Sequence, residues 1–224
     1  MSLGWRVGLA AVCVVLFARS VCGQATVTLE FTNENLQPSH WVLTIHSDGS
    51  GQYDSFPSEA VGTESNRVRE VAVHRPLHLS QRFVERVFAT ARQRRLFNFQ
   101  CESRLKVAFQ GEKRLSYSGP DGSGSCEYNY SKDSQIQALG ESLIAVESTI
   151  EFGERLEVLE QHDRLGMDRE MSALYEGSQN GSALEVGVIQ ETLERIVSDE
   201  QVLERVRRKA RLLLVEAHSG TGGN

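Results

Sequence analysis

Few of the features that mark a catalytic or a fibrous protein occur in this chain. Its 224 residues include only 4 prolines and 19 glycines, too few for a collagen-like or low-complexity sequence. It contains no P-loop, no GxGxxG after a strand, no HExxH and no CxxC, and no serine has glycines two residues before and after it. Because these nucleophile, phosphate and metal motifs are missing, we expect no catalytic residues and no cofactor.

Basic charge is scarce as well. The chain has 24 Lys and Arg residues against 30 Asp and Glu residues, a formal net charge of −6. A general nucleic-acid binder needs an excess of cations to displace phosphate counterions, so this class is excluded. One basic run occurs, and its residues are Arg205, Arg207, Arg208, Lys209 and Arg211. Because apolar residues at 203, 206, 210 and 213 occupy the other face of the expected helix, we interpret the run as a solvated face.

Only one long apolar run is present, and it lies at the N-terminus. Arg6 precedes the run GLAAVCVVLFA at residues 8–18, and the small residue Gly23 follows it. This is the pattern of a secretory signal peptide over residues 1–23, with cleavage after Gly23 or, alternatively, after Ala25. The run has about eleven residues, whereas a bilayer-spanning helix needs about 20. We therefore expect a cleaved leader, no stable membrane span in the mature chain, and a periplasmic or secreted location.

Cys22 offers a lipoprotein alternative, in which its side chain would be acylated. A lipoprotein site has an aliphatic residue three positions before the cysteine and a small residue directly before it. Arg19 and Val21 occupy those two positions here. We therefore expect no acylation.

Removal of the leader leaves two cysteines, Cys101 and Cys126. Thiols are oxidised outside the cytosol, so an even pair in an exported chain predicts a disulfide. The alternative is a reactive or metal-binding pair, but no histidine lies at easy ligand spacing from either cysteine. We therefore predict a Cys101–Cys126 bridge.

Residues 24–150 are expected to form an α+β domain built on a small antiparallel sheet. Alternating apolar residues predict strands at 27–31 and 41–45, and Asp48-Gly49 predicts the corner of a hairpin that returns along 52–56. A further strand through Val68, Val71 and Val73 should end at Pro76. Ser80 is the expected N-cap of a helix reaching about residue 95, whose apolar positions are 83, 84, 87, 88 and 91. A second hairpin is expected from strands 105–109 and 114–117 around a turn at 110–113, followed by a short strand at 126–130.

From Ser134 onward the pattern predicts helices. Ser134 and Gln137 form a capping box, and the apolar stripe that follows shifts its phase near Gly153, which predicts a bend or break there. Residues 151–217 should form a helical segment ending in an αα-hairpin, with capping boxes at Ser182 and Ser198. The tail at 218–224 should be disordered.

The histidines and the two Asp-Gly-Ser-Gly sequences are the remaining candidates for a metal site. His40 and His46 would be about 20 Å apart on a regular strand, and Pro76 separates His74 from His78. The Asp-Gly-Ser-Gly sequences at 48–51 and 121–124 lack the ligand spacing of a calcium loop and are interpreted as hairpin corners. We expect no metal ligands.

The order of features over residues 27–150 resembles a family of small exported bacterial domains of unknown function. The features are a strand at 27–31, an aromatic-led strand from Trp41 to Gly49, then Tyr53, and Leu79-Ser80 opening a helix. Because that family has no established activity, the resemblance implies no functional residues. Separately, residues 199–214 (DEQVLERVRRKARLLL) resemble one phrase of HEAT-type helical repeats.

Together these observations predict an exported, non-catalytic envelope or secreted protein that acts by binding another protein. The C-terminal αα-hairpin and the exposed edge of a hairpin are the expected surfaces. Two alternatives remain, namely a small-ligand or ion-binding envelope domain and a hydrolase whose triad is assembled from distant residues.

Overall fold

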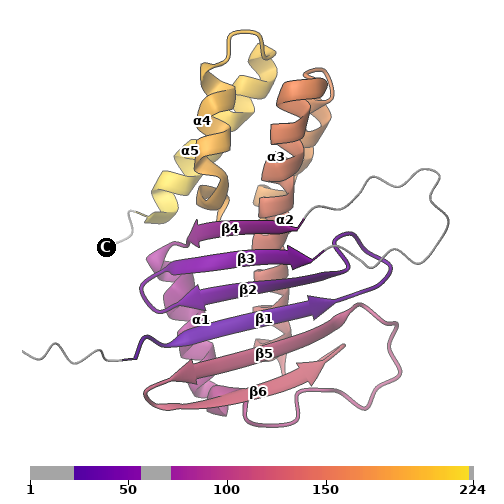
Figure 1. The fold of residues 1–224 in the computed structure, drawn as a ribbon, viewed down its shortest axis with the longest axis vertical. Helices are drawn as coiled ribbons and strands as arrows, with labels where there is room; N and C mark the ends of the chain where they lie inside the picture. The colour runs from indigo at the N-terminus through magenta and orange to yellow at the C-terminus, as the bar shows by residue number, and fades with distance from the viewer. Residues whose placement is uncertain (1–22, 57–71, 222–224) are drawn as a thin grey trace, which may run out of the picture.

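The computed structural model describes residues 23–56 and 72–221, and the predicted signal peptide therefore lies outside the described residues apart from Gly23. The described chain has an α+β fold in which helices pack on one face of a six-stranded antiparallel sheet (Figure 1). Along the sheet the strand order is β4-β3-β2-β1-β5-β6. The strands are β1 (Thr26–Thr32), β2 (His40–His46), β3 (Ser50–Phe56), β4 (Val73–His78), β5 (Glu112–Gly119) and β6 (Gly122–Tyr128).

Both Asp-Gly-Ser-Gly sequences lie at hairpin corners, as predicted. Gly49 has a φ of +90°, and the Asp48 carboxylate accepts a hydrogen bond of 2.9 Å from the backbone N–H of Ser50 at the β2–β3 corner. The second corner joins β5 to β6, where Gly119 pairs with Gly122 and only two residues lie between them. Because Gly122 has a φ of +134°, a side chain at this position would strain the turn.

The prediction that a strand ends at Pro76 is wrong. β4 continues through Pro76, which lies opposite Gln52 of β3. A proline cannot donate a ladder hydrogen bond, but β4 is an edge strand and has a neighbour on one side only. Positions 68 and 71 of the predicted strand lie outside the described residues.

The predicted N-cap of helix α1 (Gln81–Gln93) is confirmed. The Ser80 hydroxyl accepts a hydrogen bond of 3.3 Å from the backbone N–H of Phe83. The buried residues of α1 are the predicted ones, Phe83, Val84, Val87, Phe88 and Ala91. They pack on the inward-facing side chains of the sheet, which include Leu29, Leu43, Leu115 and Tyr117.

Helix α2 (Ser134–His162) differs from the prediction in two ways. Its N-cap is Asp133, whose carboxylate accepts from the N–H groups of Gln135 and Ile136, so the capping box at Ser134 is wrong. The helix also runs unbroken through Gly153, and the predicted boundary near residue 150 falls within it. The apolar stripe shifts because Ile150 packs in the sheet's core whereas Leu156 belongs to a second hydrophobic cluster.

The second cluster is formed by the C-terminal part of α2 together with the helices after it, which extend beyond the β4 edge of the sheet (Figure 1). These are α3 (Met167–Asn180), a short 3-10 turn η2 (Val186–Ile189), α4 (Gln190–Ser198) and α5 (Glu204–Thr221). The predicted αα-hairpin is confirmed as α4 and α5. Its two capping boxes are wrong, because no side chain caps α4 and Ser198 is the last residue of that helix. α5 reaches Thr221, so residues 218–221 are helical rather than disordered.

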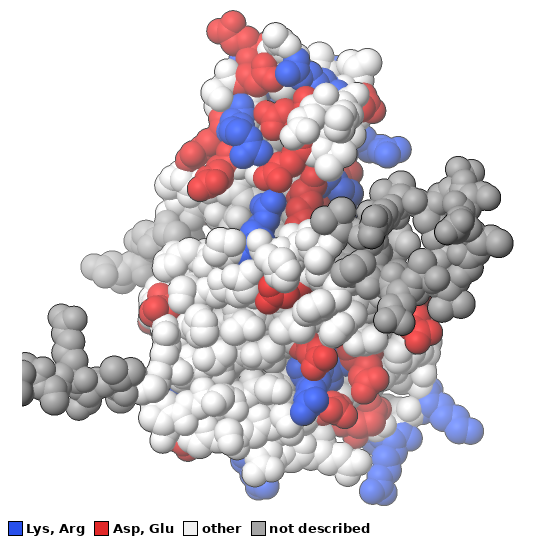
Figure 2. Space-filling view, viewed as in Figure 1, with Lys and Arg blue, Asp and Glu red and all other residues white. Residues whose placement is uncertain are grey.

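The face of the sheet opposite the helices is open and largely uncharged (Figure 2). Alternate residues of each strand point to this face, and hydroxyl side chains form cross-strand neighbours along it, among them Thr28, Thr44, Ser116 and Ser125. Charged side chains gather toward one end of the face, where β5 begins and β6 ends. Among the helices described, none is long and apolar enough to cross a membrane.

Candidate interaction surface

The chain between η1 (Arg95–Phe97) and β5 contains a continuous exposed stretch, residues 104–110, which we call segment 104–110. The predicted hairpin between 105–109 and 114–117 is wrong, because 105–109 is not a strand. β5 already has β1 on one side and β6 on the other, so neither of its edges is available to residues 105–109. Ser103 and Gly111, at the two ends of the segment, are buried.

The first anchor of segment 104–110 is the predicted Cys101–Cys126 disulfide, which the structure contains. The two Cα atoms are 5.7 Å apart, and the bond ties the chain directly before the segment to β6. Next to it, Glu102 forms a β-bridge with Ser131, and the backbone N–H of Ser103 donates to the carbonyl of Tyr130 at 2.9 Å. Three successive residues are thereby attached to the β6 strand and the turn that follows it.

Asn129 is the second anchor. Its side-chain Nδ2 donates to the carbonyl of Ala108 at 3.1 Å, and its Oδ1 accepts from the backbone N–H of Gln110 at 2.6 Å. The backbone N–H of Asn129 itself donates to Oε2 of Glu102 at 2.6 Å. One side chain at the end of β6 thus holds the last part of the segment through both of its polar atoms.

Lys113 is the third anchor and is unusual because it is a buried cation, 2% exposed, on a core-facing position of β5. Its Nζ donates to the carbonyl of Gly111 at 3.1 Å and to that of Asn129 at 2.8 Å. The ammonium lies 5.9 Å from the ring centre of Phe31 and 5.5 Å from that of Tyr128, which allows cation–π attraction. Burial lowers the pKa of Lys113 below its ordinary value. We interpret Lys113 as a structural clamp, because its donors are directed at backbone carbonyls.

Segment 104–110 carries three large apolar side chains that the fold does not bury. Leu105 is 51% exposed, Val107 38% and Phe109 59%. Single exposed apolar residues are common on protein surfaces, whereas a group of them on one segment makes that segment a candidate contact surface. The anchors at both ends prevent these side chains from folding back onto the core.

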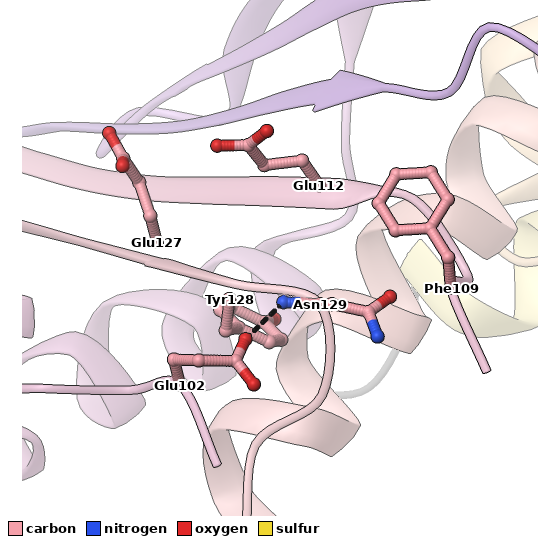
Figure 3. A pocket seen from close by; sticks show the side chains of 6 residues that line it. All are labelled: Glu102, Phe109, Glu112, Glu127, Tyr128 and Asn129. Atoms are coloured by element: carbon pink, nitrogen blue, oxygen red, sulfur yellow. Dashed lines mark hydrogen bonds between the residues drawn. The ribbon is translucent and has the colours of Figure 1, made fainter. Parts of the chain in front are cut away.

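Phe109 borders an open hollow of about 370 Å³ between the segment and the end of the sheet (Figure 3). Its other lining residues are Glu102, Glu112, Glu127, Tyr128 and Asn129. Glu112 and Glu127 point to the same side of β5 and β6 (Figure 3), and Glu127 pairs with Arg114 at 3.4 Å. The carboxylate of Glu112 has no ion-pair or hydrogen-bond partner among the described residues. The segment therefore exposes three apolar side chains together with two cations, Arg104 and Lys106, and carboxylates line the hollow beside it.

Three histidines contact residues of neighbouring strands of the sheet. His40 contacts Glu30 at 3.1 Å, His74 contacts Asp54 at 2.7 Å, and His46 contacts Thr26 at 3.1 Å. Each of these histidines is bonded locally to a neighbouring strand. Within residues 23–56 and 72–221, no group of three or more His, Cys, Asp or Glu residues is arranged to hold a metal ion.

The basic run lies on α5, and several of its members have nearby polar partners. Arg205 pairs with Asp168 at 2.9 Å, and Arg207 and Arg211 both pair with Glu204 at 2.7 and 2.9 Å. Lys209 donates to the hydroxyl of Ser172 on α3. These contacts fit the interpretation of the run as a solvated helix face.

The C-terminal αα-hairpin is the other expected interaction surface. Its large exposed apolar residues are fewer than those of segment 104–110. Leu212 and Val215 on α5 are 49% and 65% exposed. Val158 on α2 is 58% exposed, and Leu165, between α2 and α3, is 77% exposed. These residues come from three different parts of the chain, and none of them lines the hollow beside segment 104–110. They are useful as matched controls for the residues of segment 104–110.

A buried carboxyl group lies at a separate place, between α2 and the sheet. Glu147 of α2 is 7% exposed, and the hydroxyl of Tyr53 on β3 lies 3.5 Å from its Oε1. Burial raises the pKa of Glu147 well above its ordinary value, and the neighbouring carboxylate of Glu151 raises it further. Two neighbouring carboxyl groups, such as those of Glu147 and Glu151, also occur in catalytic acid–base pairs. Glu147 lies beneath the sheet, is buried, and does not line the hollow beside segment 104–110, so we assign it to the core.

Sequence reasoning identified the disulfide and placed a strand pattern at residues 105–109, but it missed segment 104–110 as a surface. The signal was the alternation of Leu105, Val107 and Phe109, which indicates apolar character without saying whether a strand partner exists. The search of family models and the search of curated proteins return no match for this chain. The resemblances to exported bacterial domains and to a HEAT phrase therefore stay predictions.

Proposed function

We propose that this chain is an exported, non-catalytic protein that binds a partner protein through segment 104–110 and the hollow beside it. The observation that carries the proposal is the exposure of Leu105, Val107 and Phe109 on a segment fixed at both ends. A fixed surface loses little conformational entropy on binding, so its apolar contacts contribute more of their free energy to affinity. The disulfide supports export, because such bonds persist in oxidising compartments.

A protein partner fits this surface better than a small ligand does. A ligand pocket normally encloses most of its ligand, whereas this hollow is open and four of its six lining side chains are exposed. A small molecule would contact it from one side only. A protein surface could cover the hollow and the three apolar side chains of the segment together.

The proposal is tested by photo-crosslinking in the cell that produces the protein. A photoreactive amino acid at Val107 should yield a discrete crosslinked product, because Val107 lies at the centre of the exposed segment. The double variant L105S/F109S carrying the same probe should lose that product. The control V158S/L165S changes two apolar residues of comparable exposure on the helical part of the chain and should retain it.

A crosslinked product that is equally strong in L105S/F109S would contradict the proposal, since the contact would then not depend on the segment. Both double variants should unfold at the temperature of the unmodified chain, because all four side chains are at least half exposed. This measurement separates loss of binding from loss of folding.

A further inference from the structure

Segment 104–110 has the residue alternation of a β-strand although it belongs to no sheet. Leu105, Val107 and Phe109 occupy alternate positions, Arg104 directly precedes them, and Lys106 lies between the first two. The chain bends at Leu105. In an extended conformation, the side chains of the residues that follow would point alternately to opposite sides and separate an apolar side from a polar one. No helix or strand of the described chain includes these residues.

Four consecutive backbone N–H groups of the segment are unpaired within the described chain, although the carbonyl of Ala108 accepts from Asn129 and the N–H of Gln110 donates to it. Within residues 23–56 and 72–221, the N–H groups of Lys106, Val107, Ala108 and Phe109 donate to no protein acceptor. All four residues are exposed. A row of exposed and unpaired backbone groups is the template on which another chain can add a strand. The anchors hold this template in place at Cys101 and at Gln110.

The charged side chains of the segment indicate which charge a partner strand should carry. Arg104 and Lys106 are exposed and form no ion pair with any carboxylate of the described chain. In a pair of strands, directly opposite residues of unlike charge stabilise the pairing and those of like charge oppose it. A strand that pairs with this segment should therefore carry acidic residues opposite the two cations.

We infer that segment 104–110 binds an extended segment of a partner protein by β-strand addition, and that this partner segment alternates apolar and acidic residues. The inference rests on the proposed function, because it gives the binding mode and the partner chemistry of the same surface. Main-chain hydrogen bonds to alternate residues within 106–109 hold the partner strand. Its apolar side chains cover Leu105, Val107 and Phe109, and its carboxylates pair with Arg104 and Lys106.

A second copy of the chain is a poorer occupant. Two copies of the segment paired antiparallel about Val107 would place Leu105 opposite Phe109, which is favourable. The same pairing would bring Arg104 and Lys106 of both copies onto one face, with four cations and no carboxylate from either segment. Lysine on an exposed strand edge is a common means of opposing self-association.

The partner chemistry is tested by selecting phage-displayed random peptides of about ten residues, the length of one long strand, on the oxidised mature chain. We expect the enriched peptides to alternate apolar and acidic residues. They should bind the chain about tenfold more weakly when Arg104 and Lys106 are both replaced by glutamate, a charge reversal on exposed side chains. The inference would be overturned if the enriched peptides lacked this alternation. It would also be overturned if none of them required Phe109 for binding.

The binding mode is tested with an enriched peptide and two proline variants, Lys106→Pro and Val107→Pro. Each removes one backbone N–H, and adjacent N–H groups of an extended chain point to opposite sides. One variant should therefore lower the affinity about tenfold, and the other should leave it within about threefold. Strand addition would be contradicted if both variants lowered the affinity strongly, or if neither variant lowered it. Thermal unfolding of each variant shows whether the fold is retained.

Failure of this inference and failure of the proposed function give different results. If the crosslink at Val107 depends on Leu105 and Phe109 but the peptides lack alternation or the proline variants behave alike, the surface binds a partner in another way. If the crosslink does not depend on these two residues, the proposed function itself is wrong. A size increase of the purified chain that L105S/F109S abolishes would identify a second copy as the occupant and overturn the inference.

Discussion

Glu185 holds Ser80 through both of its carboxylate oxygens, although the two residues are 105 positions apart in the sequence. Its Oε2 accepts from the backbone N–H of Ser80 at 2.6 Å, and its Oε1 accepts from the Ser80 hydroxyl at 2.8 Å. The same hydroxyl accepts from the N–H of Phe83 and so caps helix α1. A residue before the helix α4 therefore stabilises the start of the helix that covers the sheet.

We expect Glu185→Ala to lower the free energy of unfolding by about 1–3 kcal/mol, because hydrogen bonds to a charged acceptor are lost and an N-cap is weakened. Urea unfolding followed by circular dichroism measures this change. Glu191→Ala, which removes an exposed carboxylate of α4, is the matched control and should change stability by less than about 0.5 kcal/mol. Equal effects of the two variants would show that the contact with Ser80 contributes little.

The buried acid Glu147 should make stability depend on pH. Burial and the nearby carboxylate of Glu151 raise its pKa in the folded chain, whereas the unfolded chain keeps the ordinary value near 4.5. A raised folded pKa stabilises the protein fully below the unfolded value, and this contribution is lost as pH rises through the folded pKa. The free energy of unfolding of the unmodified chain should therefore fall as pH increases above about 5.

Glu147→Gln removes the titrating group while retaining an amide that can accept a hydrogen bond from Tyr53. Its free energy of unfolding should depend less steeply on pH in urea titrations between pH 5 and pH 8. Part of the slope should remain, because burial also raises the pKa of Glu154. Glu176→Gln, a change at an exposed position of α3, should retain the full slope. Parallel pH profiles for the unmodified chain and E147Q would contradict this assignment.

Local patterns predicted the parts of the sheet whose partners lie close in sequence. The hairpin of β2 and β3 was predictable because alternation and the Asp48-Gly49 corner lie within a few residues of each other. Segment 104–110 was assigned wrongly because its alternation is equally good, and only the placement of β5 between β1 and β6 denies it a partner. Whether residues 105–109 find a strand partner is decided by contacts between distant parts of the chain, which sequence periodicity does not reveal.

The helical part shows the same limit. Gly153 was expected to interrupt the helix, but an added Cβ there would lie 2.4 Å from Cγ2 of Ile189. The glycine therefore permits close packing of α2 on η2 instead of breaking the helix. The capping box predicted at Ser182 would have used Glu185, three residues later, but the Glu185 carboxylate accepts from Ser80 instead. The disulfide was predictable because only two cysteines remain after the leader.

Asn129 should control the order of segment 104–110. Asn129→Ala removes the acceptor for the N–H of Gln110 and the donor to the carbonyl of Ala108. We expect the Gln110 amide to exchange its hydrogen with solvent about fivefold faster, since one local hydrogen bond of about 1 kcal/mol is lost. Hydrogen exchange measured by NMR tests this expectation. Ser123→Ala, at an exposed position of β6, should leave the Gln110 amide unchanged.

The disulfide and the predicted export can be tested together by intact-mass measurement of the protein from the cell that produces it. The mass should correspond to a chain that begins at Gln24 or at Thr26 and lacks the two thiol hydrogens of Cys101 and Cys126. Alkylation should add no mass until a reductant is present, because both sulfurs are bonded and the two residues are buried. Replacement of both cysteines by alanine should lower the free energy of unfolding by about 2–4 kcal/mol, as expected for removal of one native disulfide. A chain that retains Met1, or that is alkylated without reductant, would contradict export or the disulfide respectively.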